Sequence, residues 1–334
     1  MKANPWNELK LEKCLQEKLN QELDKATADS IWSDYVQIRD KALDVASNIN
    51  KSEPFLTDHG VKHLADVMNK SYQLVKHEIN EFSYTELYFL CVIIMLHDVG
   101  NIDGRDNHQN KITNFYNDVR GEDSSFNQER PLVFQAVSAH CGESKFGDKD
   151  TLKQLSENSN LLDLHLRLRE ISAVLRFGDE LAEGPQRTCD YILKTASKKN
   201  KSLIYHVYAQ ITTIYVNEEL NRIAITYNID IDNKQVKAIG IKKLLNFIYK
   251  RILKLDEERR YCKYYTNILS PYKQTHVTFN VTKKGVPVID LPEIRLEDKF
   301  NIASDTSAMK IFFNQYPQLK VDSIIESIQK AAKK

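Results

Sequence analysis

The strongest constraint in the sequence is the uninterrupted apolar run from Leu87 to Leu96. A helix that is apolar nearly all round has no face suited to water, so the run predicts a core helix that is buried on every side. It is far shorter than the ~20 residues that cross a bilayer, and we therefore expect no membrane span. His97 and Asp98 follow it directly. Ionisable groups need partners where a helix leaves the core, which makes this doublet the first candidate functional feature.

The size and charge of the chain limit its class of function. At ~100–200 residues per domain, 334 residues predict about two domains. Lys and Arg total 47, Asp and Glu total 46, and the formal net charge is +1. This balance gives no global attraction to nucleic acid or to an anionic membrane, and it disfavours a nuclease. The five cysteines are scattered and contain no C-x-x-C pair. We therefore expect no disulfide framework or cysteine zinc site, and a cytoplasmic location.

Hydrophobic periodicity divides the chain into a helical half and a mixed half. Residues 1–195 predict an all-helical domain, and residues 196–334 predict a smaller α+β domain with an antiparallel sheet, so the expected fold class is mainly α. The second domain is expected to cap the site, regulate it or form an oligomer, and a homo-oligomer stays open. The expected helices are 8–27, 29–48, 62–80, 85–97, 131–140, 161–183, 240–267 and one or two in 305–333, with a short helix in the loop region 101–128; the expected strands are 202–217, 221–231, 275–282 and 286–291.

Several other histidines and aspartates stand at the ends or on one face of the predicted helices. Asp179 lies near the end of one helix, and His140 ends another. His59 and His63 are four apart, so they share one face of a helix. Imidazole nitrogens and carboxylate oxygens are a ligand set suited to zinc, iron, manganese and similar divalent ions. Such an ion lowers the pKa of a bound water and neutralises charge on phosphorus.

Three local segments carry a family resemblance. Asp58–Val67 reads DHGVKHLADV, Leu96–Gly100 reads LHDVG, and Leu175–Leu181 reads LRFGDEL. Together they contain H-x-x-x-V, H-D-x-G and R-x-x-D-x-L in that order. This series resembles the HD superfamily of metal-dependent phosphohydrolases over residues 50–190, the helical half only. The resemblance implies a helical domain and a divalent metal cofactor, which would be Mn, Fe, Zn, Ni, Co or Mg.

The resemblance also implies a ligand set. The metal ligands would be His59 or His63, His97, Asp98 and Asp179. The opening histidine of the family is commonly followed, four places on, by an apolar residue, and His63 has Val67 at that position. We therefore favour His63 and keep His59 as a ligand or as a neighbour of the ligands.

Further residues follow from the branch of the family that hydrolyses nucleoside triphosphates. His108 is the candidate that would lie near the substrate phosphates, whereas Asn101 stands where that branch often has another histidine. His140 resembles an extra histidine that helps some members bind a second metal or the phosphate, and Cys141 replaces the second of two adjacent histidines found there. The expected catalytic residues are His108, His140 and Asp98.

Hydrolysis at phosphorus also needs positive charge around the phosphoryl oxygens. The expected phosphate-binding candidates are Lys145, Arg105, Arg176 and Arg187. The resemblance implies hydrolysis of a nucleotide, with deoxynucleotide mono- or triphosphates as the favoured substrates. A phosphodiesterase for a cyclic nucleotide or a short oligonucleotide is the alternative enzyme. A module that senses a nucleotide without turnover is the alternative outside enzymes.

Overall fold

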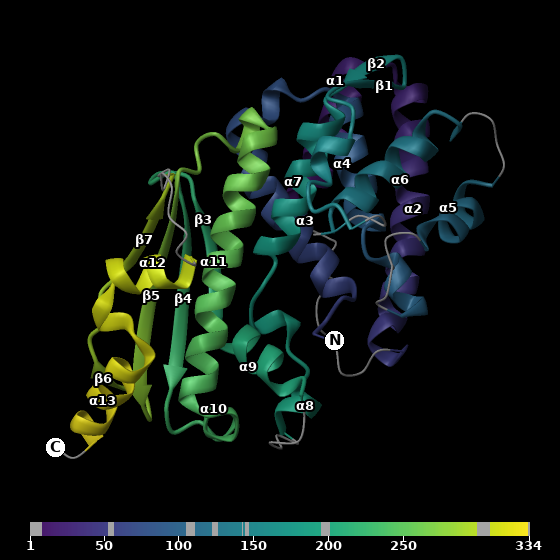
Figure 1. Cartoon of the computed structure of the whole chain (residues 1–334). Helices are drawn as coiled ribbons and strands as arrows, with labels where there is room; N and C mark the ends of the chain where they lie inside the picture. The colour runs from purple at the N-terminus through teal and green to yellow at the C-terminus, as the bar shows by residue number, and fades with distance from the viewer. Residues whose placement is uncertain are drawn as a thin grey trace. The chain divides into compact units, whose positions relative to one another are not determined.

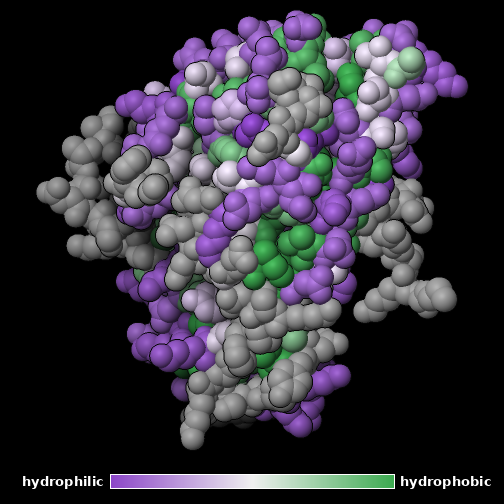
Figure 2. Space-filling model, turned by 90° about the vertical axis from the view of Figure 1, so that its right-hand side faces the viewer, coloured by the Kyte–Doolittle hydropathy of each residue, from purple (hydrophilic) through white to green (hydrophobic). Residues whose placement is uncertain are grey.

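The computed structural model describes residues 9–52, 57–104, 111–121, 126–141, 143, 147–194, 201–298 and 308–332. They belong to two compact units, each of which combines two stretches of the chain. The first unit lies within residues 1–182 and 261–270, and the second lies within residues 183–260 and 271–334. On the face drawn in Figure 2 the surface is largely hydrophilic, with apolar side chains gathered in small areas.

The first unit is built from helices. They are α1 (Lys10–Glu22), α2 (Lys25–Ser52), α3 (Val61–Val75), α4 (Tyr84–Leu96), α5 (Ile112–Arg120), α6 (Glu129–Ala139) and α7 (Leu168–Leu181), with the short 3₁₀ helices η2 (Lys76–Glu81), η3 (Val99–Asp103), η6 (Leu152–Gln154) and η8 (Asn267–Leu269). A small hairpin, β1 (Ser159–Leu161) with β2 (Leu164–Leu166), precedes α7. The helical half is therefore not purely helical.

Helix α4 forms the centre of the first unit (Figure 1). Ser83 and Glu86 form a capping box, in which each side chain accepts the backbone N–H of the other residue. Every residue from Tyr84 to Leu96 is buried, and the helix contacts α1, α2, α3, α6 and α7. The predicted core helix is thus confirmed. Among the described residues, Tyr84–Ile102 is the one stretch that passes a length and composition test for a membrane span, and 94% of the tested window is buried inside the protein.

The second unit places helices against a five-stranded sheet (Figure 1). Its elements are η7 (Pro185–Arg187), α8 (Asp190–Lys194), α9 (Leu203–Ile211), β3 (Thr212–Asn217), β4 (Arg222–Asp230), α10 (Lys234–Ile239), α11 (Ile241–Tyr265, which ends in the first unit), β5 (Gln274–Lys283), β6 (Val286–Ile289), β7 (Ile294–Glu297), α12 (Ala308–Gln315), η9 (Pro317–Leu319) and α13 (Val321–Ala332). The strand order is β3-β4-β5-β6, and β7 also pairs with β5. Three pairings are antiparallel, whereas β4 and β5 run parallel because α10 and α11 form the crossover between them.

A buried cation fixes α11 to the sheet. Arg259 is 1% exposed, and its guanidinium donates to the carboxylates of Asp256 and Asp298, the hydroxyl of Thr275 and the carbonyl of Tyr272. A buried charge needs this degree of pairing to be tolerated. The contacts hold the C-terminal part of α11 against the start of β5.

The fold class is confirmed: a mainly helical chain with a smaller sheet-containing part that follows it. Two boundaries differ from the sequence expectation. Residues 203–211 form helix α9 instead of the first half of a strand, and only Thr212–Asn217 is extended. The helix expected over 161–183 begins at Leu168, because the hairpin β1–β2 takes up residues 159–166.

Candidate metal centre

The first two histidines of the site stand at the start of α3. His63 lies in the first turn of the helix, and His59 lies directly before its N-cap, Gly60. The Asp58 carboxylate accepts the N–H of Gly60 at 2.6 Å, which fixes the turn that leads into the helix. His63 is fully buried and His59 is 6% exposed. Both imidazoles therefore belong to the interior of the first unit.

His97 is held so that one ring nitrogen remains available. It stands at the C-terminal end of α4, and its Nδ1–H donates to the carbonyl of Ile94 at 2.8 Å. In the neutral ring Nε2 then carries the lone pair, and this buried atom has no hydrogen-bond partner among the described residues. Burial lowers the pKa of His97 to about 4, so the ring is neutral near neutral pH. A neutral imidazole held by its other nitrogen is the usual form of a metal-bound histidine.

Two carboxylates meet these imidazoles. His63 Nε2 lies 3.4 Å from Asp98 Oδ2 and 3.1 Å from Asp179 Oδ1. His97 Nε2 lies 3.5 Å and 3.8 Å from the same two oxygens. His59 Nδ1 makes the shortest contact, 2.7 Å to Asp98 Oδ2. Residues from three separate helices and the turns beside them thus converge on one small region.

The donor atoms fit a divalent cation. Two groups, His59/His63/Asp98 and His63/His97/Asp179, each have their ligand atoms within 4.8 Å of one another, and His63 belongs to both. Burial alone would raise the pKa of Asp179, but the imidazoles of His63 and His97 outweigh it and hold the pKa below its usual range. Ionised carboxylates and neutral imidazoles in a buried cluster are suited to Zn, Fe, Mn and related ions. The cluster could therefore hold a divalent metal ion.

His140 adjoins this cluster from the end of α6. Its ring centroid lies 5.2 Å from that of His97, and its Nδ1–H donates to the carbonyl of Val137. Burial lowers the pKa of His140, but the sulfur of Cys141 and the carboxylates of Asp179 and Asp98 outweigh it and raise the pKa to about 9. The ring is therefore cationic near neutral pH in the metal-free protein.

The structure assigns no place in this cluster to the other sequence-predicted residues that it describes in the first unit. Arg105, His108 and Lys145 lie outside the described residues. Arg187 is 8% exposed and belongs to the second unit, in η7. Asn101 is buried at η3, directly after the His97-Asp98 doublet.

Arg176 has a structural environment instead of a phosphate-binding one. Its Nη1 donates to the carbonyls of Ala139 and Cys141 and to the hydroxyl of Thr151, at 3.3, 3.1 and 2.7 Å. Its guanidinium also stacks over the ring of Tyr261, 4.4 Å from the centroid. Arg176 thus holds the backbone on both sides of His140. The sequence spacing indicated that Arg176 lies near the site, but it did not indicate which oxygen atoms accept hydrogen bonds from its guanidinium.

We expect Arg176→Met to destabilise the protein by about 2–3 kcal/mol, because buried acceptors lose a charged donor. Urea denaturation measures the change. The control is Arg295→Met, since Arg295 forms an exposed ion pair with Glu293 whose loss costs about 0–1 kcal/mol. Unchanged stability of Arg176→Met, with a large rise in KM for substrate, would instead place Arg176 on the phosphate.

A glycine beside Asp179 sets the distance between α7 and α3. A Cβ on Gly178 would lie 2.5 Å from Ser71 Oγ, and its next contacts would be backbone atoms of Ser71 at 3.5 and 3.6 Å. The close approach brings Asp179 within reach of His63 on the facing helix. A glycine inside a helical pattern often marks such a packing requirement, but the sequence does not say which helix it meets.

Gly178→Ala tests the close approach of α7 to α3, because the two possible effects of the substitution change the stability in opposite directions. Alanine alone would stabilise a helix by about 1 kcal/mol over glycine, whereas overpacking costs about 1–3 kcal/mol. We expect a net loss of stability and weaker metal binding, because α7 must move away from α3. In a Ser71→Ala background the 2.5 Å contact is gone, and the same Gly178→Ala change is expected to be neutral or stabilising. Equal effects in both backgrounds, measured by urea denaturation, would contradict the close approach.

Comparison with known protein families is consistent with this geometry. The model of the HD-CE family matches residues 53–254, which is more than half of the chain. The chain belongs to the HD-CE family. The HD-CE match contains the five residues of the cluster and the neighbouring His140, and it extends beyond residues 50–190 into the second unit. No curated protein and no solved structure gives a significant match to this HD-CE chain. An HD-family domain with a possible metal site indicates a metal-dependent, hydrolase-like function.

Proposed function

We propose that this HD-CE protein is a phosphohydrolase that cleaves a phosphoester or phosphoanhydride bond of a nucleotide, with deoxynucleotides as the favoured substrates. One observation supports the proposal most: two buried His/Asp groups share His63 inside an HD-family domain. A buried histidine needs only partners for its two ring nitrogens. This cluster contains more imidazoles and carboxylates than that requirement explains. They are the donor set of a hydrolytic metal site with positions left for water and substrate.

In this proposal His63, His97, Asp98 and Asp179 bind the cation. His59 donates to Asp98 Oδ2 at 2.7 Å and thereby orients that carboxylate toward the other ligands. When bound, the divalent cation polarises a phosphoryl oxygen and lowers the pKa of a water. The choice of His63 over His59 as the first ligand is supported by the contacts of His63 Nε2 to both carboxylates, 3.4 Å to Asp98 Oδ2 and 3.1 Å to Asp179 Oδ1.

His140 is the proposed proton donor to the leaving oxygen. It lies beside His97, and its Nδ1–H is engaged by Val137. Its Nε2, which lies 3.6 Å from Cys141 Sγ, is the nitrogen that we propose donates to a substrate. Its pKa of about 9 in the metal-free protein keeps the proton on the ring near neutral pH. The substrate side of the site is marked by Asp179, whose side chain is 28% exposed while those of His63 and His97 are fully buried.

The test is a substrate panel with product analysis. The full chain, freed of metal and then supplied with Mn²⁺, Co²⁺, Ni²⁺, Zn²⁺, Fe²⁺ or Mg²⁺ in turn, is incubated with deoxynucleoside and ribonucleoside mono- and triphosphates and with cyclic nucleotides. Chromatography then detects phosphate, pyrophosphate, triphosphate or nucleoside. Release of a phosphate product from a deoxynucleotide supports the proposal. Cleavage of a cyclic nucleotide alone would favour the phosphodiesterase, and tight binding without turnover under every metal would favour a nucleotide sensor.

A further inference from the structure

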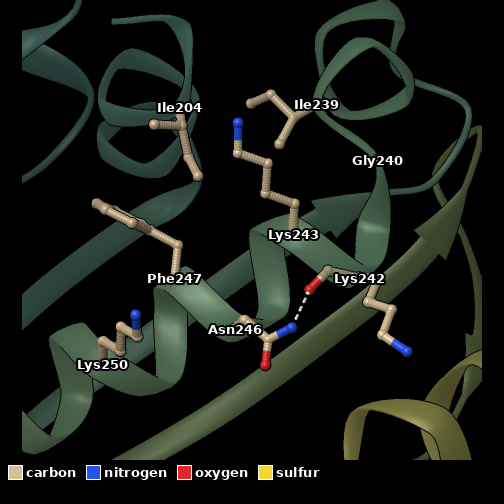
Figure 3. Close-up of a pocket in the computed structure, with 8 residues that line it drawn as sticks. All are labelled: Ile204, Ile239, Gly240, Lys242, Lys243, Asn246, Phe247 and Lys250. Carbon is tan, nitrogen blue, oxygen red and sulfur yellow. Dashed lines mark hydrogen bonds between the residues drawn. The ribbon is translucent and has the colours of Figure 1, made fainter. Parts of the chain in front are cut away.

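The second unit contains a pocket along the first turns of α11 (Figure 3). Its volume is about 620 Å³, within the range of small-molecule sites in proteins. The lining residues come from α9, the end of α10 and α11: Ile204, Ile239, Gly240, Lys242, Lys243, Asn246, Phe247 and Lys250. The proposed metal ligands and His140 belong to the first unit, whereas every residue that lines this pocket belongs to the second.

The cations of the pocket differ in their pairing. Lys242 donates to the Asp322 carboxylate at 2.8 Å and extends away from the other lysines (Figure 3). Lys243 extends between Ile204 and Ile239 (Figure 3). Among the residues that the structure describes, neither Lys243 nor Lys250 has a carboxylate within ion-pair distance. Two ammonium groups thus reach the pocket with no neutralising carboxylate from the described part of the chain.

The backbone adds to this positive potential. The pocket includes Gly240, whose φ of 86° makes the turn between α10 and α11, and a Cβ there would meet nothing within 4 Å. The turn places the N-terminal end of α11, a helix of 25 residues, at the pocket. The N-terminus of a helix carries a partial positive charge and favours anions. Lysine ammonium groups and a helix N-terminus together are suited to phosphate.

The pocket also has an apolar and aromatic wall. Ile204 and Phe247 face it from α9 and α11 (Figure 3). The ring of Phe247 is supported edge-on by Tyr205 and Tyr208, at centroid distances of 5.3 and 5.2 Å. Tyr205 is 53% exposed. A flat apolar group could be covered by this wall while its charged end meets the lysines.

We propose that this pocket binds a nucleotide, with its phosphates between Lys243 and Lys250 and its base against Ile204 and Phe247. Phosphate alone would use the cations but leave the aromatic wall uncovered, and an apolar ligand would leave the ammonium groups unpaired. A mononucleotide combines an anionic phosphate with a flat base, and its size suits the volume of the pocket. A long nucleic acid would need a broader basic surface than a chain of net charge +1 suggests.

Calorimetric titration of the full chain with ATP, in EDTA so that no metal-dependent turnover occurs, tests the proposal. Inorganic tripolyphosphate and adenosine are titrated separately as the two halves of the ligand. The test variant is Lys243→Gln with Lys250→Gln. The matched control is Lys234→Gln with Lys254→Gln, which removes the same charge from exposed positions of α10 and α11 outside the pocket lining.

We expect the pocket variant to weaken ATP binding about tenfold or more, because two charge-assisted contacts are lost. The control pair should bind ATP as the wild type does, and ATP should bind more tightly than tripolyphosphate or adenosine. Equal ATP affinities of the two double-lysine variants would overturn the proposal. Tripolyphosphate that binds the wild type as tightly as ATP does would also overturn it. Tighter binding of a short single-stranded DNA, reduced equally by both pairs, would indicate a polyanion-binding surface instead.

Discussion

Asp98→Asn is expected to abolish stable metal binding and turnover while the protein remains folded. The carboxylate contacts three imidazoles of the cluster, at 2.7, 3.4 and 3.5 Å. Loss of a residue that only orients a ligand already costs about 10–100-fold in metal affinity, so the loss of a ligand charge should exceed about 100-fold. Without the polarisation that the cation supplies, several kcal/mol of barrier lowering are lost, which corresponds to about 10³-fold in kcat.

Metal analysis of protein purified without chelator and steady-state kinetics measure these two effects. The matched control is Asp118→Asn, an exposed aspartate on α5. Circular dichroism shows whether the fold is retained, since asparagine keeps the shape of the side chain. Wild-type metal content in Asp98→Asn, together with normal turnover, would remove Asp98 from the metal centre.

His140→Gln is expected to lower kcat by about 10²–10⁴-fold without a comparable loss of metal. The effect follows from the position of His140 beside His97 and from its proposed role as the proton donor to the leaving oxygen. A p-nitrophenyl phosphate ester provides the diagnostic comparison, because its leaving group departs without being protonated. The variant should therefore lose much less activity on this ester than on a nucleotide.

The control for His140→Gln is His165→Gln, an exposed histidine on β2 in the same unit. An equal loss of activity on both substrates would assign His140 to phosphate binding. Loss of the metal with the activity would assign it to the ligand set instead. Either outcome would contradict its proposed role as a proton donor.

The helical half was predictable where local pattern and tertiary environment agree. The run Leu87–Leu96 has no polar face, so burial on all sides was the stable solution available to it, and α4 is buried throughout. Residues 203–211 were interpreted as a strand because Ile, Val and Tyr are abundant there. Their apolar positions nevertheless recur every three to four residues, which is the helical period, and the segment forms α9.

The hairpin before α7 could not be predicted from glycine signals. Its turn uses Leu162 and Asp163 at φ of 51° and 59°, a conformation usually taken by Asn-Gly or Asp-Gly. A pattern search therefore extends the helix backward over it. Tertiary context overrides the local preference, since Leu161 and Leu166 are buried in the core of the unit.

The residues of the site were predictable as a set, but their contacts were not. The histidine and aspartate motifs indicated which side chains converge, because imidazoles and carboxylates beside buried helices need partners. The 2.5 Å separation of a Gly178 Cβ from Ser71 depends on the packing of two helices far apart in the sequence. The same holds for the acceptors of Arg176, which lie 25 to 37 positions away.

The most direct test of the central claim is a crystal structure of the full chain grown with Mn²⁺ and recorded for its anomalous signal. We predict one strong anomalous peak within coordination distance of the donor atoms of His63, His97, Asp98 and Asp179. A map without a peak among these side chains, in crystals with saturating Mn²⁺, would contradict the metal centre and with it the proposed hydrolysis.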